Sequence, residues 1–475
     1  MPTSGGGVDA ASVVRLSRIG GHVANLVARD GVNRVARFVA AVLLARALTL
    51  HDYGVFNTGI ALAGIAVTGA SLGLNDLGAR DIGARQDDPA WRSGLAGQVL
   101  AARLGLVVAL SAIAIAVIVV AAPASLGTAL LIVAIVLTMS ANADWILRGL
   151  ERMAALGNAI LIGGVAVLLG SVLLLLTTGS ANGALAVILA GEAVSTAAAW
   201  AWSDSAPRIG VDREALGRLL SRSWPLGVSS LAMYTYYANL DTVLLAALRS
   251  AREAGLYSAP YRVFLALNAV SIYTAYAFLP ALSRAVEAGN EGPAFAQLRR
   301  AVRYLLAYTV VLVALAELVG GELMGLLFGD AFSGTGDVFV VLSLALMWFS
   351  IGFPIGYSLI ARHQNRRFLA GAATGGLLNL ALNLVLIPAY GAIGAAAATG
   401  LAFAAACLVW LRASLLLGRE AAADIIAMAT VSAIAIPALA VDGLRIPGFV
   451  VTLAIAAFCA RSALRHTAAA SGASE

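Results

Sequence analysis

The stretch NLVARDGVNRVARFVAAVLLAR, residues 25–46, combines the length of a membrane span with the charges of a polar site. About 20 residues at 1.5 Å each cross a bilayer, and the charged ones here include Arg29, Asp30, Arg34 and Arg37. A helix turns about 100° per residue, so these four side chains share one arc of its circumference and most leucines and valines lie outside that arc. A charge at membrane depth costs several kcal/mol unless it faces protein or water. The pattern therefore predicts a membrane helix that lines a wet, positive cavity.

The composition identifies a polytopic membrane protein. Of the 475 residues, 61% are hydrophobic and only 12% are charged, and the mean hydropathy is +0.90. A soluble protein would carry about 25% charged residues. The net charge of +6 does not indicate nucleic acid as a partner, because the basic residues gather in short joints between apolar runs.

Apolar runs separated by polar joints predict about 14 membrane spans. If both ends of the chain are cytoplasmic, the inside joints and tails hold about 22 arginines and the outside joints only three, which is a strong positive-inside bias. A missed helix would destroy this bias, so an even count is expected. The predicted spans are 24–47, 54–76, 97–121, 126–148, 154–178, 182–203, 223–248, 257–282, 303–323, 336–361, 367–388, 391–412, 420–441 and 446–463.

A faint internal repeat joins the two halves of the chain. LLARALTLHDYGVFN (43–57) and LLAALRSAREAGLYS (244–258) align with a shift of about 201 residues, which matches Gly54 with Gly255. Both copies fall at predicted outer joints, and an even number of spans separates them. Parallel repeats related by an axis along the membrane normal are a known transporter architecture.

Buried arginines are the first candidates for a binding site. Arg34, Arg37 and Arg262 lie two or more turns from the predicted interfaces, so we expect them to face a polar lumen. Arg29 and Arg103 lie nearer the inner face, where either the lumen or the lipid headgroups could receive them. The alternative for the deep arginines is an internal ion pair. Guanidinium groups bind phosphate through a planar fork and stay charged when buried, which favours a diphosphate over a cationic drug.

The acidic residues at membrane depth are candidates for internal ion pairs and for binding a coupling cation. Asp30 stands one turn before Arg34, and Asp241 could reach Arg262 across two helices. Asp30, Glu192 and Asp241 are the candidate carriers of a coupling cation. Glu192 could equally be a neutral acid that hydrogen bonds to Thr196.

Aromatic hydroxyls on two predicted spans are candidates for contact with sugars. Tyr234, Tyr237 and Tyr261 present a ring and a hydroxyl, although helix packing is the commoner use of such residues. The two cysteines, Cys407 and Cys459, lack ligand-like neighbours in the sequence. We therefore expect no metal site and no cofactor.

Several motifs carry a resemblance to a known family. DYGVF (52–56), RGLERM (148–153) and NLDTVLLAAL with AGLYSAPYR (239–262) are similar to landmarks of the Wzx-like polysaccharide flippases, a branch of the multidrug/oligosaccharidyl-lipid/polysaccharide exporter superfamily. FLPALSRAVEAGN (278–290), LLFGDAF (326–332) and NLVLIPAYGAIGAAAATG (383–400) resemble later landmarks of the same family. Their order and spacing are more specific than any one of them.

The resemblance implies an all-α fold of two parallel six-helix bundles around a central V-shaped cavity, followed by two extra helices. On that basis the chain divides into a cytoplasmic tail (1–20), an N-terminal bundle (21–203), a cytoplasmic linker (204–222), a C-terminal bundle (223–416), two further spans (417–463) and a second cytoplasmic tail (464–475). The resemblance also implies a place in the bacterial cytoplasmic membrane.

The implied activity is alternating-access transport of a prenyl-diphosphate-linked oligosaccharide, an O-antigen or exopolysaccharide precursor, from the cytoplasmic to the outer leaflet. A cation gradient and polysaccharide polymerase or assembly proteins are expected to act with it. A lipid II flippase and a cation-coupled multidrug antiporter are the alternatives. A polytopic enzyme is not favoured, because such enzymes need acids or histidines near a large outer loop. The four histidines here are scattered near span ends, at His22, His51, His363 and His466.

Overall fold

The computed structural model describes residues 31, 34–121, 125–177, 179–208, 212–237 and 240–414, and within them it leaves the side chains of 111–121, 225–226 and 228–237 undescribed. The regular structure of these residues is helical. Nine helical segments of this part are long and apolar enough to cross a membrane. The chain is thus an integral membrane protein of helical fold, as its composition predicts.

A helix over residues 34–47 opens the described chain. It is followed by α2 (Leu50–Ser71), α3 (Leu74–Gly83), α4 (Pro89–Ala121), α5 (Leu126–Ser140), α6 (Asp144–Gly149), α7 (Met153–Leu175), α8 (Ala181–Ser203), α9 (Arg213–Tyr237), α10 (Leu240–Leu248), α11 (Ala251–Glu287), α12 (Gly292–Phe328), the 3-10 helix η1 (Asp330–Thr335), α13 (Gly336–Ala361) and α14 (Asn365–Ser414). The expected spans 420–441 and 446–463 and both expected tails lie outside the described residues.

The long helix α14 contains two of the predicted spans. It breaks at Gly391, whose φ of 55° is a left-handed conformation that favours glycine. A Cβ on Gly394 would lie 2.2 Å from the carbonyl oxygen of Leu386, so the chain reverses closely at this break. The carboxylate of Glu253 accepts a hydrogen bond from the N–H of Ala392 at 2.9 Å and thereby caps the second half.

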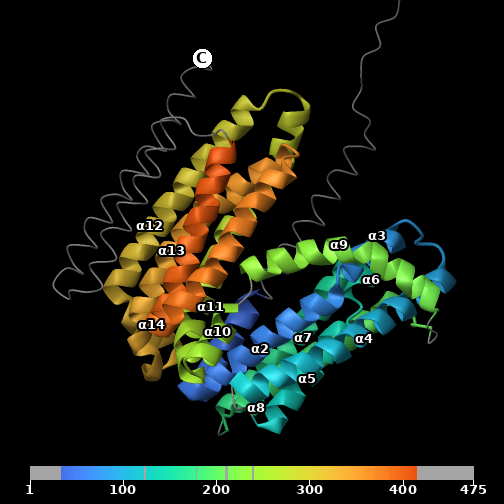
Figure 1. The fold of residues 1–475 in the computed structure, drawn as a ribbon, viewed down its shortest axis with the longest axis horizontal. Helices are drawn as coiled ribbons and strands as arrows, with labels where there is room; N and C mark the ends of the chain where they lie inside the picture. The colour runs from blue at the N-terminus through green and yellow to red at the C-terminus, as the bar shows by residue number, and fades with distance from the viewer. Residues whose placement is uncertain are drawn as a thin grey trace, which may run out of the picture.

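The seventh predicted span, 223–248, is divided between α9 and α10. Helix α9 begins before this span, at Arg213, inside the segment 204–222 that is the predicted linker. Figure 1 shows α9 running from the neighbourhood of α10 toward α3 and α6, so this segment joins the two halves as a helix.

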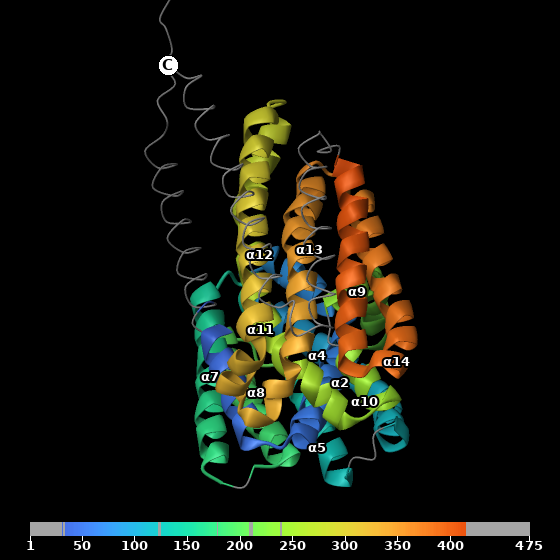
Figure 2. The ribbon, with the colours of Figure 1, turned by 90° about the vertical axis from the view of Figure 1, so that its left-hand side faces the viewer.

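The helices form two bundles, and the core of one extends into helices of the other. Helices α11–α14 surround a core that includes Leu306, Leu342 and Phe349. In Figure 2 helices α12, α13 and α14 stand side by side, and 94% of the most apolar window of α13 is buried between its neighbours. The helix over 34–47 and helices α2, α5 and α8 share a second core that includes Phe56 and Ile132. This second core continues into α11 and α12 of the other bundle.

The two bundles meet at the starts of α2 and α11, where the sequence repeat falls. Thr49 and Ser250 cap the two helices by accepting hydrogen bonds from the N–H groups of Asp52 and Glu253, three residues later in each case. Figure 1 shows the bundles diverging from this contact in a V. The contact lies at the predicted outer ends of the helices, so the opening of the V faces the predicted cytoplasmic side.

Glycine makes the contact between the bundles unusually close. A Cβ on Gly54 would lie 1.6 Å from the carbonyl oxygen of Ala251, and a Cβ on Gly255 would lie 2.3 Å from that of Leu50. Only residues without a Cβ allow the two backbones to approach in this way. The pair of glycines aligned by the repeat is therefore what lets α2 and α11 touch.

Candidate functional site: the basic junction between the bundles

Two arginines of the helix over 34–47 contact different bundles. The guanidinium carbon of Arg34 lies 5.5 Å from the ring centroid of Tyr273 on α11, a cation–π contact with the C-terminal bundle. Nη2 of Arg37 lies 3.7 Å from Oε1 of Glu192 on α8, in the N-terminal bundle. The Arg37 side chain remains 57% exposed, so this ion pair leaves much of its guanidinium open to another anion.

Arg262 ties α11 to α2 across the junction. Its Nη2 donates a hydrogen bond to Oδ1 of Asn57 at 2.8 Å. The residue lies about 16 Å along α11 from the start of that helix. A guanidinium at this depth needs polar partners, and Asn57, as a neutral amide, does not compensate its charge. Arg262 therefore brings a positive charge to the face of α11 that meets the other bundle.

Arg103 forms hydrogen bonds inside the N-terminal bundle. It is 2% exposed and donates to the carbonyl oxygens of Met139 and Asn142, each at 3.2 Å, at the end of α5. Carbonyls at a helix C-terminus lack intrahelical donors, and a guanidinium satisfies them well. This placement favours a structural role, and we leave Arg103 out of the site proposed below.

Asp241 lies in a buried polar cluster of the C-terminal bundle. It is 4% exposed and accepts hydrogen bonds from Tyr257 Oη at 2.7 Å, Thr399 Oγ1 at 2.9 Å and Asn383 Nδ2 at 2.5 Å. The expected pairing of Asp241 with Arg262 is therefore wrong, because the carboxylate turns toward α14 and the guanidinium turns toward α2.

The Asp241 cluster is rich in oxygen atoms that could hold a cation. Asn379 accepts from Asn383 at 3.1 Å, and the remaining oxygen of Asn383 is buried without a hydrogen-bond partner among the described residues. Carboxylate, amide and hydroxyl oxygens are the ligands of hard cations. The described residues of the cluster include one carboxylate, so a monovalent ion suits it better than a divalent one. No group of three acid, histidine or cysteine side chains suited to a metal ion occurs in the described part of the chain.

Glu192 pairs with Arg37 and not with Thr196, its neighbour on α8. Thr196, one turn later, donates its hydroxyl to the carbonyl of Thr138 at 3.3 Å. The alternative in which Glu192 hydrogen bonds to Thr196 is therefore wrong. The Glu192 side chain is 16% exposed, so solvent can reach it beside the helix over 34–47, which we call the basic helix.

Of the three tyrosine candidates, Tyr261 is the one whose side chain the structure describes. Tyr261 is buried, and its ring stacks between those of Tyr257 and Phe264 at centroid distances of 5.3 and 5.2 Å. Its faces are covered by these rings, so Tyr261 is also left out of the proposed site. The side chains of Tyr234 and Tyr237, like the residues Arg29 and Asp30, lie outside the described part.

The comparisons with known proteins agree with this architecture. Residues 22–286 match the family model described as polysaccharide biosynthesis protein. The chain belongs to this polysaccharide biosynthesis family. The matched region contains the basic helix, the glycine contact and Arg262.

One curated relative shares part of the chain. The probable low-salt glycan biosynthesis flippase Agl15 of Haloferax volcanii is 28% identical over 181 residues, which are 37% of each protein. The match thus spans well under half the length of that relative.

Solved structures share the fold of this family member over nearly its whole length. The lipid II flippase MurJ in an inward closed conformation aligns with a TM-score of 0.67 and 14% identity, over 90% of this chain and 98% of that one. An inward-facing multidrug transporter of the MATE family, from the MOP superfamily, aligns with a TM-score of 0.58 and 15% identity, over 81% of this chain and 94% of that one. The chain therefore shares the fold of these two structures.

Sequence reasoning missed the polar partners of the charged residues. Asn57 and Thr399 give no signal in a chain where single polar residues recur in many helices. Asn379 and Asn383 are spaced one turn apart, which places them on one helix face, and this spacing was the available clue. Their role emerges only when α14 packs against α10 and α11.

Proposed function

We propose that this protein is a flippase that moves a prenyl-diphosphate-linked oligosaccharide from the cytoplasmic to the outer leaflet. The diphosphate and sugars would enter between the two bundles from the cytoplasmic side, while the prenyl chain stays in the lipid. The bundles would then rock about the contact at α2 and α11 to open outward. Membership of the polysaccharide biosynthesis family supports this proposal, as does the partial match to a glycan flippase.

The proposal is supported by the contacts that Arg34 and Arg262 make between the bundles and by the exposed guanidinium of Arg37, one turn after Arg34 on the same helix. Their described contacts are a ring, an ion pair and an amide, all of which a diphosphate could replace or add to. Each guanidinium can form a bidentate, charge-assisted pair with phosphate oxygens. A hydrogen bond to a charged group contributes about 1.5–3 kcal/mol, which corresponds to roughly tenfold to a hundredfold in affinity.

Coupling to a cation is the second part of the proposal. Asp241 with its amide and hydroxyl neighbours would hold a monovalent cation, such as Na⁺, within the C-terminal bundle. Binding there would change the packing of α10 and α11 against α14. Glu192 would respond to cargo instead, because a diphosphate that takes Arg37 releases this carboxylate. Asp30 stays a candidate from the sequence alone.

The proposal is tested by transport in proteoliposomes that hold the full-length protein and a prenyl-diphosphate oligosaccharide. Access of a membrane-impermeant glycosidase to the sugar measures translocation. We expect Arg37→Ala and Arg262→Ala to lose most of the activity, and Arg262→Lys to retain part of it, because lysine keeps the charge without the fork. Arg366→Ala is the matched control, since Arg366 lies exposed at the start of α14. Normal transport in both alanine variants would remove the proposed site.

The same assay separates the alternatives. Lipid II also carries a diphosphate, so a lipid II flippase would show the same arginine dependence but would reject other glycans. A cation-coupled multidrug antiporter would expel cationic dyes and ignore the lipid-linked sugar. The positive charge at the junction disfavours this alternative. Polysaccharide polymerase and assembly proteins are the expected partners for the product.

A further inference from the structure

Helix α11 leaves one of its faces open, and this face carries Arg262. A helix turns about 100° per residue, so Ala266, Tyr273, Tyr276 and Ala277 all lie within about 60° of Arg262 around the helix axis. Ala266, Tyr276 and Ala277 are exposed, and Tyr273 is half-buried. The opposite face is buried in its own bundle and holds Phe264, Asn268, Ser271 and Ala275. The open face is thus a continuous stripe that joins a guanidinium to two tyrosines.

This open face is turned toward the other bundle. Arg262 donates its hydrogen bond to Asn57 of α2, and Arg34 of the basic helix lies against the ring of Tyr273. Tyrosines near the end of a span commonly face lipid headgroups. The two contacts with the N-terminal bundle instead place this stripe of α11 along the junction, beside the arginines of the proposed site.

Tyr276 offers an open aromatic ring that is held in place from behind. It is 50% exposed, and its ring centroid lies 5.5 Å from that of Tyr357 on α13, with the ring planes at 63°. Tyr357 in turn packs against Phe353 at 4.5 Å and Phe368 at 5.8 Å. Packing of this kind fixes the orientation of a ring and leaves the uncovered part for a ligand.

We infer that Tyr276 binds the first sugar of the cargo, the one joined to the diphosphate. This inference rests on the proposed function. A diphosphate on Arg34 lies beside Tyr273, and Tyr276 follows one turn later, about 4.5 Å along α11 toward its predicted cytoplasmic end. The C–H groups on one face of a hexose pack on an aromatic ring, and the phenol hydroxyl can bond to a sugar hydroxyl. The stripe therefore matches a sugar that follows directly after a diphosphate.

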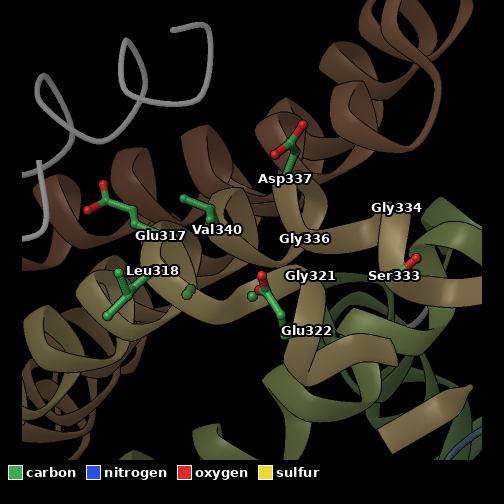
Figure 3. Close-up of a pocket in the computed structure, with 11 residues that line it drawn as sticks. Glu317, Leu318, Gly321, Glu322, Ser333, Gly334, Gly336, Asp337 and Val340 are labelled. Carbon is green, nitrogen blue, oxygen red and sulfur yellow. The ribbon is translucent and has the colours of Figure 1, made fainter. Parts of the chain in front are cut away.

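Another hollow of the C-terminal bundle does not offer such a surface. It has a volume of about 350 Å³, lies between α12, η1 and the start of α13, and is lined by the carboxylates of Glu317, Glu322 and Asp337. Figure 3 shows Glu317 directed away from the other two, so these acids do not converge on one point. Negative charge there repels a diphosphate, and no aromatic ring is among its described lining residues. The face of α11 is therefore the better match to the cargo.

Two lipid probes of equal charge test the inference. One is geranylgeranyl diphosphate esterified with glucose, and the other is the same lipid esterified with methanol. Native mass spectrometry of the full-length protein measures the preference for the glucose probe. We expect Tyr276→Ala to lose about fivefold or more of this preference and to bind the methyl probe like the wild type. Tyr276→Phe should retain most of the preference, because the ring remains.

Tyr304→Ala is the matched control, since Tyr304 is a tyrosine of α12 that is 43% exposed and has no place on the stripe. It should keep the preference of the wild type. Tyr276→Leu keeps the test decisive if Tyr276→Ala does not fold, because leucine fills much of the space without a flat ring and should lose the preference as well.

The inference is overturned if the wild type does not prefer the glucose probe, or if Tyr276→Ala and Tyr276→Leu keep the preference of the control. Arg37→Ala separates this outcome from the fate of the diphosphate site, since it should weaken binding of both probes. If it binds both like the wild type while Tyr276→Ala loses the preference, the diphosphate site fails and the sugar contact stands. If the wild type binds neither probe, both are refuted.

Discussion

Replacing Gly54 by alanine should open the contact between the bundles. The added methyl would lie 1.6 Å from the carbonyl oxygen of Ala251, although Cβ atoms in proteins essentially never come within 3.0 Å of another heavy atom. The obstructing atom belongs to the backbone of α11, which cannot turn aside as a side chain can. The two helices must therefore separate by roughly 1.4 Å at this point.

The size of the effect follows from the cost of overpacking. Forcing a methyl into a close-packed contact costs about 1–3 kcal/mol, and this cost falls only on the conformation in which α2 and α11 touch. A difference of that size shifts a conformational equilibrium by about 5- to 150-fold. We therefore expect Gly54→Ala to populate the outward-open state in which the predicted cytoplasmic ends approach each other.

Distances between spin labels measure this shift. Labels at Ala90→Cys and Arg366→Cys, exposed positions at the predicted cytoplasmic ends of the two bundles, would report their separation by double electron–electron resonance. The natural cysteines, Cys407 and Cys459, would be replaced by alanine. The label distance should shorten in Gly54→Ala relative to the unsubstituted protein.

Gly376→Ala is the matched control for this experiment, because a Cβ on Gly376 meets no atom of the described residues within 4 Å. It should leave the label distance unchanged. If Gly54→Ala gives the same distance distribution as Gly376→Ala, the glycine contact does not hold the closed conformation and the reasoning is refuted.

Three further substitutions test other parts of the structure. Asp241→Asn should abolish the stabilisation of the protein by Na⁺, read as a melting temperature that no longer rises with Na⁺ at constant ionic strength; an undiminished rise would exclude the Asp241 cluster. Arg103→Ala should lower the free energy of unfolding by about 2–4 kcal/mol, because two carbonyls at the end of α5 lose a charged donor; unchanged denaturation would contradict this structural role. Arg46→Ala should shorten the label distance, as Gly54→Ala does, because it removes the hydrogen bond from Arg46 to the carbonyl oxygen of Leu327 that links the two bundles. A longer label distance in Arg46→Ala would contradict this prediction.

The sequence predicts the class of the fold well because membrane spans are governed by length and apolarity. Even the repeat at Gly54 and Gly255 proves to be a structural feature, with the same capping pattern and the same close approach in both copies. Helix limits are less predictable. Hydropathy marks the apolar core of α9 but not its polar first turns, so the predicted span begins at residue 223 whereas α9 begins at Arg213.

The candidate site is only partly predictable, for a different reason. Depth in the membrane identifies Arg34, Arg37 and Arg262 as unusual. Arg103 lies nearer the predicted inner face, where either the lumen or the lipid headgroups could receive it, and it instead satisfies carbonyls inside its own bundle. Depth alone cannot distinguish a lumen from a buried helix end. The partner of Asp241 was also misassigned, because sequence proximity favoured Arg262 whereas packing brought Asn383 and Thr399 to it.

Binding of the cargo to the purified protein tests the central claim most directly. Native mass spectrometry would compare a prenyl-diphosphate oligosaccharide with the corresponding neutral glycolipid, on the wild-type protein and on Arg34→Ala, Arg37→Ala, Arg262→Ala and the control Arg366→Ala. We predict that the wild type and the control prefer the diphosphate lipid, and that each junction variant loses about tenfold or more of that preference. Equal binding of the diphosphate lipid by all of these proteins would contradict a diphosphate site at the junction.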